Sequence, residues 1–594
     1  MPVSSSLVWD LDVIFAGGPT GSAFDAEYAS ISDVIVALSA RADAVPASLD
    51  IAAFAELLLD FETLSPRLEQ LGTFTGCHAA ADATGAAAIR ADVRVGDLWG
   101  AFSRAWVVPG SRIAFCAEDE FASLIARPEL AHMRGMLDER RRLGRLRLPE
   151  AEEALSTELA RDGITAWGNL YDVESGALRI SVDRGQGVEE LSAGQASLLL
   201  RNPDPEVRRR GAAALQKGWR TVARTCATAL THITGTRLTL NARRNLDTLD
   251  EPLAGAKIER RTLDAMVQAA RNAAPLMQRY FRAKARALGT SRLAWCDIGA
   301  PLGESGGQIE YSRAADFIVE QFASFSPPMA AFATRAFEQR WIEVEDRPGK
   351  RGGGFCADVP VLKQSRIFMT WGNTDASVST LAHELGHAYH NEVLHPLPNS
   401  QRRVPMTLAE TASTFAEALV REASRARAAS NNEKLRLLDG ALGDAAAFLV
   451  NIPARFELEL ALYDMRRNGP LDPDELEATT TRIFSSWHGD AVSDVDPTFW
   501  SSKLHFFIPS LAFYNFPYLF GYLFSALVYE HFRPLGAAGA PGYVRLLRRT
   551  GDEWAEPIAR DELGMDLGEV STWEKALTGV ARDVEAFERI TDEN

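Results

Sequence analysis

The sequence of 594 residues is poor in cysteine, and no two cysteines have the CxxC spacing. The five cysteines are odd in number and widely scattered: Cys77, Cys116, Cys226, Cys296 and Cys356. This distribution argues against a disulfide framework and against a thiolate zinc site, and it favours reduced thiols. The amino terminus lacks a basic start followed by an apolar run, so a secretory signal is not expected. We therefore predict a cytoplasmic protein.

An excess of positive charge is also missing. The chain holds 63 Lys and Arg against 80 Asp and Glu, which gives a net charge of −17. Nucleic-acid binding needs a basic surface, so we expect no nucleic-acid partner. Apolar residues at 46% and charged residues at 24% are typical of a globular protein.

One long run lacks charge. No Asp, Glu, Lys or Arg occurs from Phe506 to Tyr529, which is long enough to span a bilayer. However, Pro509, Pro517 and Gly521 interrupt it, and four tyrosines add hydroxyl groups. We expect a buried segment that lines a site, and no membrane partner.

Most of the sequence has helical apolar spacing, which predicts a mainly α-helical fold. We divide it into an amino-terminal helical region, residues 1–200, and a second region, residues 201–594, which holds the candidate catalytic motifs described below. The first region includes a β-hairpin predicted over residues 165–185, with its turn at 174–176. Asn202-Pro-Asp-Pro205 opens a long helical tract over residues 206–290. Strand signals return at 340–345 and 365–371, on either side of a Gly-rich loop at 347–354.

The strongest functional signal is His-Glu-Leu-Gly-His at residues 383–387. Residues four apart lie on one face of a helix, so His383 and His387 can bind one metal ion. Glu384 then lies beside that ion and can take a proton from water, as a general base does. An apolar stripe on the opposite side supports the helix, which we expect Asp375 or Ser377 to cap.

A second amphipathic helix follows around Leu408-Ala-Glu-Thr-Ala-Ser-Thr414. Hydrolytic zinc sites use three protein ligands and keep one position open, and Glu410 is the candidate third ligand. Glu417, on the same face, either orients a ligand histidine or is a solvated carboxylate. His390 is not needed as a ligand. We predict one Zn²⁺ per chain, because two imidazoles and a carboxylate suit zinc.

These motifs resemble the M3 metallopeptidases, specifically their oligoendopeptidase F branch. The resemblance rests on Thr380–His390 and residues 408–414, and weaker similarity extends over most of the chain, from Trp9 to the His/Tyr region at 505–521. It implies a two-lobed, zincin-type helical fold with a small sheet beside the metal helix. It also implies a deep channel in which short unstructured peptides are cleaved.

The tetrahedral intermediate of such a reaction needs hydrogen-bond donors for its oxyanion, each worth ~3 kcal/mol. The candidates are His505 and either Tyr514 or Tyr522, with Tyr518 nearby in sequence. Phe516 stands where the family pattern favours Tyr, so the sequence leaves the choice among the tyrosines open. An extended substrate is expected to pair with the strand at 365–371 if that strand lies at an exposed sheet edge.

Two other functions remain open. A zinc exopeptidase is the nearer one, although the Gly-x-Met-Glu-Asn signature of aminopeptidases is absent. A carboxypeptidase would need a cationic clamp for the terminal carboxylate, which the sequence does not exclude. The other alternative is a catalytically inactive helical peptide-binding protein, against which the intact His383, Glu384, His387 and Glu410 argue.

Overall fold

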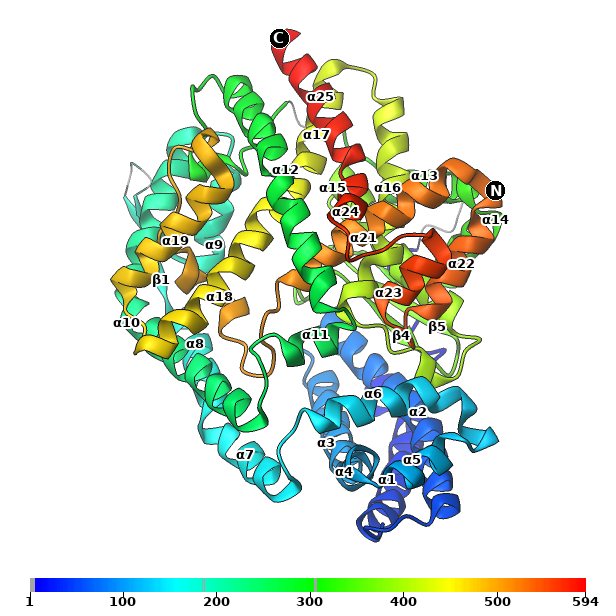
Figure 1. Ribbon diagram of the computed structural model, residues 1–594. Helices are drawn as coiled ribbons and strands as arrows, with labels where there is room; N and C mark the ends of the chain where they lie inside the picture. The colour runs from blue at the N-terminus through cyan, green and yellow to red at the C-terminus, as the bar shows by residue number, and fades with distance from the viewer. Residues whose placement is uncertain (1–5, 184, 186, 304–306, 594) are drawn as a thin grey trace. The chain divides into compact units, whose positions relative to one another are not determined.

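The computed structural model describes residues 6–183, 185, 187–303 and 307–593, and the chain folds into two compact units (Figure 1). The first unit comprises Met1–Leu146, Gly306–Ser424 and Ser525–Met565, and the second comprises Arg147–Ser305, Arg425–Phe524 and Asp566–Asn594. The predicted division into 1–200 and 201–594 follows the order of the sequence, whereas the units interleave segments that are far apart along it.

The first unit is mainly helical. Its elements are η1 (Gly18–Thr20), α1 (Ser22–Asp43), α2 (Ile51–Ala81), α3 (Ala86–Ala105), α4 (Val107–Phe115), α5 (Glu118–Ile125), η2 (Pro128–Met133), α6 (Arg134–Arg145), α13 (Tyr311–Phe325), α14 (Pro327–Glu338), β3 (Ile342–Glu343), β4 (Phe355–Val359), β5 (Gln364–Phe368), α15 (Asp375–Leu394), η5 (Asn399–Gln401), α16 (Met406–Arg427), η9 (Arg533–Ala538), α22 (Ala540–Arg549), α23 (Ala555–Ile558) and the π-helical η10 (Ala559–Leu563). Helix α21 (Phe516–Phe532) continues from the second unit into the first.

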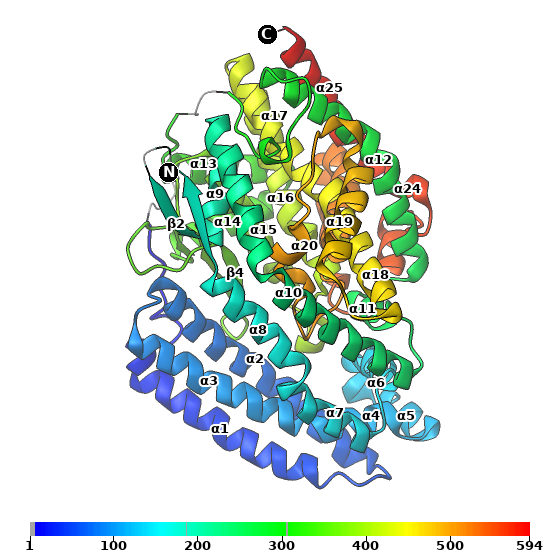
Figure 2. The ribbon, with the colours of Figure 1, turned by 90° about the vertical axis from the view of Figure 1, so that its left-hand side faces the viewer.

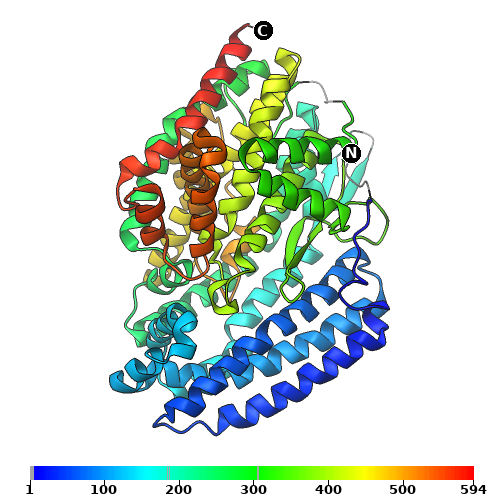
Figure 3. The same cartoon turned by 90° about the vertical axis from the view of Figure 1, so that its right-hand side faces the viewer.

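Helices α1, α2 and α3 run side by side, as Figures 2 and 3 show from opposite sides. Each turns a stripe of buried apolar residues toward its neighbours, including Phe24, Leu68 and Phe74. The Asp50 carboxylate caps α2 by accepting hydrogen bonds from the Ala52 and Ala53 amides at 3.1 and 3.2 Å. The mainly helical character predicted from the apolar spacing is thus confirmed for this part of the chain.

The sheet of the first unit has the strand order β3-β5-β4. Strand β5 pairs parallel with β3 and antiparallel with β4, so it is the central strand. The expectation of an edge strand at 365–371 is therefore wrong, because its main-chain groups are used on both sides. Among the described strands, β4 and the two-residue β3 form the edges.

Helix α15 carries the His-Glu-Leu-Gly-His motif and packs against β4 and β5. Its predicted apolar stripe is buried, with Leu381, Leu385 and Ala388 fully enclosed. The expected cap at Asp375 or Ser377 is wrong, because Asp375 is already the first residue of the helix. Thr374 is the N-cap, and its Oγ1 accepts from the Ser377 amide at 3.3 Å.

The second unit is also mainly helical. Its elements are α7 (Glu150–Asp162), α8 (Ile164–Ala177), β1 (Arg179–Asp183), β2 (Val188–Ser192), α9 (Ala193–Leu198), η3 (Leu199–Arg201), α10 (Pro205–Arg244), α11 (Asp250–Ala256), α12 (Arg260–Ala287), η4 (Trp295–Asp297), α17 (Asn431–Ala446), the π-helical η6 (Ala447–Asn451), α18 (Ile452–Asn468), α19 (Pro473–His488), η7 (Gly489–Ala491), α20 (Phe499–Ser502), η8 (Leu504–Phe506), α24 (Val570–Ala576) and α25 (Thr578–Glu593).

The hairpin of this unit is displaced from its predicted position. Residues 164–177, expected to include the first strand and the turn, form α8, and the antiparallel strands are β1 and β2. The long helical tract after Asn202 is confirmed. Its first helix, α10, has 40 residues and is capped by Asp204, which accepts from the Glu206 amide at 2.8 Å.

Most of the uncharged run from Phe506 to Tyr529 is buried, as expected, with Phe520, Leu523 and Phe524 at most 1% exposed, whereas Leu511 is 39% exposed. Within the described chain, one helical stretch, Asn431–Asn468, is long and apolar enough to cross a membrane by length and composition. In its most apolar window, 61% of the residues are buried.

Candidate metal centre

His383, His387 and Glu410 come together from α15 and α16, with their ligand atoms within 4.8 Å of one another. Glu410 Oε2 lies 3.3 Å from His383 Nε2 and 3.4 Å from His387 Nε2. A tetrahedral zinc ion with bonds of about 2.0–2.1 Å holds its ligand atoms about 3.3–3.4 Å apart. The spacing and the chemistry of these three donors therefore fit a divalent metal such as zinc.

The close approach of α15 and α16 depends on Gly386. A β-carbon at this position would lie 2.5 Å from both the Ala412 carbonyl oxygen and the Ser413 α-carbon. Both are backbone atoms of α16 and cannot move independently of that helix. Glycine in the motif thus lets the second helix bring Glu410 up to the two imidazoles.

The charges at this centre favour a cation. Burial lowers the pKa of His383, but the carboxylates of Glu410 and Glu417 outweigh it and raise that pKa to about 10. Burial raises the pKa of Glu410, yet its hydrogen bond to His383 and the charge of His387 bring it down to about 2. Burial lowers the pKa of His387 to about 4, so this imidazole is neutral and able to ligate.

Glu384 lies beside these ligands on α15 and is 7% exposed. Burial, together with the charge of Glu410, raises its pKa to about 7, in the range expected of a general base. In the described part of the chain, no group donates a hydrogen bond to its carboxylate. Gly354, at the end of the Gly-rich loop, runs close by: a β-carbon there would lie 3.4 Å from Glu384 Oε1.

Glu417 contacts the ring nitrogen of His383 that does not face the metal-binding group. Its Oε2 is 3.3 Å from His383 Nδ1, and its Oε1 accepts from Ser379 Oγ at 2.8 Å. An acceptor at Nδ1 fixes the proton there and leaves Nε2 free to bind a metal. This geometry favours the interpretation that Glu417 orients the ligand histidine, and it disfavours the alternative that Glu417 is a solvated carboxylate.

Replacing Glu417 with alanine is expected to weaken zinc binding by about 10–100-fold, because His383 loses the group that orients it. Competition with a chromophoric chelator measures this affinity. Glu422→Ala, on the same helix, is the matched control and should bind zinc as the unmodified chain does. Equal affinities for the two variants would contradict the orienting role.

The remaining sequence candidates lie elsewhere. His390 is 3% exposed and its Nε2 contacts Thr550 Oγ1 at 2.8 Å, so it faces away from a ligand position. His505, Tyr514 and Tyr522 belong to the second unit, and their catalytic roles stay predictions. Tyr514 accepts a hydrogen bond from the Tyr518 hydroxyl at 2.7 Å, whereas the Tyr522 ring stacks on Phe448 with 4.8 Å between centroids.

Sequence reasoning missed several groups that shape these sites. His505 Nδ1 contacts Asn515 Oδ1 at 2.8 Å and Arg455 Nη1 at 3.4 Å. Asn515 adjoins the predicted Tyr514 in sequence, which was a usable signal. Arg455 is 50 residues from His505 and carries no motif, so only the fold identifies it.

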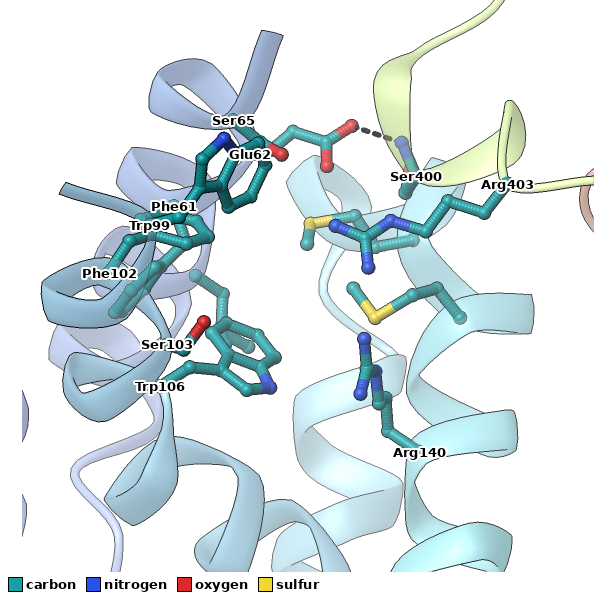
Figure 4. A pocket seen from close by; sticks show the side chains of 13 residues that line it. Phe61, Glu62, Ser65, Trp99, Phe102, Ser103, Trp106, Arg140, Ser400 and Arg403 are labelled. Atoms are coloured by element: carbon teal, nitrogen blue, oxygen red, sulfur yellow. Dashed lines mark hydrogen bonds between the residues drawn. The ribbon is translucent and has the colours of Figure 1, made fainter. Parts of the chain in front are cut away.

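The first unit also holds a cavity of about 250 Å³. Figure 4 shows Phe61, Trp99 and Trp106 on one side of it, and the guanidinium groups of Arg140 and Arg403 on the other. None of the residues that line it belongs to the metal-binding group. This cavity is therefore a feature separate from the candidate metal centre.

Comparison with known proteins gives a consistent result. Peptidase family M3 matches residues 326–560, and Oligopeptidase F matches residues 113–179. The chain is 22% identical to oligopeptidase PepF of Bacillus subtilis over 95% of this chain and 84% of that protein. It is 25% identical to the plasmid-borne oligoendopeptidase F of Lactococcus lactis, over 57% of each chain.

Solved structures share the fold. A crystal structure from Chlamydophila abortus superposes with a TM-score of 0.87 at 19% identity and covers 98% of both chains. Oligoendopeptidase-F from Enterococcus faecium gives 0.72 at 17% identity, over 96% of this chain and 99% of that one. With the family matches and the His383, His387 and Glu410 group, the chain belongs to peptidase family M3 and is a metallopeptidase of the oligoendopeptidase F type.

Proposed function

We propose that the protein is an endopeptidase that binds one zinc ion per chain and hydrolyses internal bonds of short unstructured peptides. The observation that carries the proposal is the spacing of 3.3 and 3.4 Å between Glu410 and the two imidazoles, which matches a tetrahedral zinc site. All five cysteines are free thiols. Their reduced state is compatible with a cytoplasmic location, which we also propose.

His383 Nε2, His387 Nε2 and the Glu410 carboxylate would hold the zinc ion. When bound, zinc supplies Lewis acidity, which lowers the pKa of a water molecule from about 15.7 to ~7. The Glu384 carboxylate takes the proton of the attacking water and later delivers it to the nitrogen of the leaving amine. Burial of Glu384 keeps its pKa near neutrality, so it can both accept and release this proton.

Donors for the oxyanion remain those proposed from the sequence: His505 and Tyr514 or Tyr522. His505 Nδ1 lies 2.8 Å from Asn515 Oδ1 and 3.4 Å from Arg455 Nη1, and these two contacts favour opposite protonation of that nitrogen. Burial lowers the pKa of His505, and the charges of Arg455 and Lys503 lower it further. The Tyr514 hydroxyl accepts from the Tyr518 hydroxyl at 2.7 Å, which leaves its own proton to donate. Tyr514 is therefore the stronger candidate.

An extended peptide can pair with the outer edge of β4. Thr73 Oγ1 donates to the Asp358 carbonyl at 2.7 Å, so this carbonyl points away from β5. Peptide groups alternate in direction along an antiparallel strand, which turns those of Cys356 and Gly354 to the same outer edge. Because Gly354 lies beside Glu384, a strand added here would bring its main chain past the general base.

Peptides blocked at both ends test the proposal. We expect the zinc-loaded protein to cut acetylated, amidated peptides at internal bonds, because neither terminus takes part in the chemistry. Mass spectrometry of the products locates the cut. A chelator should abolish cleavage and added zinc should restore it. Loss of single residues from unblocked peptides only would identify an exopeptidase instead.

A further inference from the structure

Two cationic side chains, Arg455 and Lys503, lie against the ring of Phe499 in the second unit. The guanidinium carbon of Arg455 lies 5.3 Å from the centroid of the Phe499 ring, and Lys503 Nζ lies 4.7 Å from it. Arg455 Nη1 is also 3.4 Å from His505 Nδ1. Helix α18 supplies Arg455, and the segment between α20 and η8 supplies Lys503, so two separate elements place like charges together.

This cluster has no counter-ion of its own in the described chain. No described carboxylate forms an ion pair with Arg455 or Lys503. The acid that acts on Lys503 is Asp496, whose Oδ1 instead accepts from the Thr498 amide and hydroxyl at 2.9 and 2.7 Å. Burial lowers the pKa of Lys503 to about 8, and the charge of Arg455 adds to this shift. Half-buried like charges are unfavourable unless an anion joins them.

The cluster is also held in place. Arg455 Nε donates to Asn451 Oδ1 at 2.7 Å, and the Phe499 ring lies against both cations. The fully buried Asn515 contacts His505 Nδ1 through its Oδ1 at 2.8 Å. Two residues before Asn515, the Phe513 amide donates to Glu459 Oε1 at 2.7 Å. In the described structure, the other nitrogen atoms of the Arg455 guanidinium donate to no oxygen. They offer a ligand a preorganised pair of donors.

We propose that Arg455 and Lys503 form a binding site in the second unit for a carboxylate group of the peptide ligand. The inference rests on the proposed function, since it takes the ligand to be a peptide. Carboxylates are the anions that an unmodified peptide carries, at its C-terminus and on Asp and Glu side chains. A guanidinium binds a carboxylate through two parallel N–H groups, and the lysine adds a point charge.

Binding of matched peptides to the Glu384→Gln variant tests the site without cleavage. One peptide without acidic residues is made as the free acid and as the C-terminal amide, and a third is the amide with one internal Glu. Isothermal titration calorimetry should show a Kd about tenfold or more lower for a peptide with a carboxylate, since hydrogen bonds between charged groups are stronger than neutral ones. A gain in affinity for the free acid would identify the C-terminal carboxylate as the bound group, and a gain for the Glu peptide would identify an acidic side chain.

Adding Arg455→Met or Lys503→Met to that variant should remove the difference between the peptides. Arg224→Met, at an exposed position of α10, removes one positive charge elsewhere and should preserve it. If Arg455→Met does not fold by circular dichroism, Lys503→Met decides. Equal affinity for all three peptides, or a difference that survives both substitutions, would overturn the carboxylate site. Failure of the unmodified protein to cut any peptide would instead refute the proposed function.

Discussion

Glu384→Gln should lower the kcat of peptide cleavage by about 10²–10⁴-fold while zinc stays bound. The amide has nearly the same shape as the carboxylate but cannot take a proton from the attacking water. The three metal-binding side chains are unchanged, and no described group donates to Glu384, so the substitution breaks no hydrogen bond. The loss is therefore expected in the chemical step rather than in folding or metal binding.

Cleavage of a fluorogenic peptide gives kcat and KM, and plasma mass spectrometry gives zinc per chain. Glu392→Gln is the matched control: it makes the same change on the same helix, at a residue paired with Arg335. This control should keep nearly full activity. Full activity in Glu384→Gln, with zinc present, would refute the role of Glu384 as general base.

Glu410→Ala is expected to abolish stable zinc binding, and with it all cleavage. The substitution leaves two imidazoles, one fewer than the three protein ligands of a hydrolytic zinc site. It also removes a carboxylate that is ionised at neutral pH and whose negative charge attracts a cation to the centre. After dialysis, zinc per chain should fall from about one to nearly none, and the rise in Tm on adding zinc should disappear.

Ser413→Ala provides the comparison for Glu410. Ser413 Oγ donates to Glu410 Oε2 at 2.6 Å, so its removal loosens the carboxylate without deleting it. This variant should keep zinc with reduced affinity. Unchanged zinc content in Glu410→Ala would mean that another residue supplies the third ligand, and the assignment of α16 to the metal centre would be wrong.

Local sequence patterns predicted the residues of the metal centre well, since each ligand lies on one face of a single helix. The spacing of His383 and His387 follows from helical geometry, and their apolar stripe identified the side of α15 that is buried. The approach of Glu410 was inferred from a second amphipathic pattern. The pairing of these two helices in space was not contained in either pattern alone, and it was inferred from their shared layout and from the need of hydrolytic zinc for a third protein ligand.

Strand pairing and exact helix ends were less predictable. Residues 166–171 have a composition that suits a strand, yet they form part of α8, because packing outweighs weak local preference. The edge position expected for residues 365–371 failed because strand order depends on partners elsewhere in the chain. Arg455 was not predicted as a site residue for the same reason. It belongs to no sequence motif, so only its neighbours in space identify it.

The two variable positions of the His-Glu-x-x-His motif, residues 385 and 386, differ in the side chains that they can accommodate. Leu385 fills the hydrophobic interior, where another apolar side chain of similar volume can substitute for it. Position 386 instead lies where the backbones of α15 and α16 approach each other, and even one methyl group there would push the two helices apart. A search pattern for catalytically competent relatives with this helix pairing should therefore require glycine there, and chains with a bulkier residue should be examined for loss of the metal.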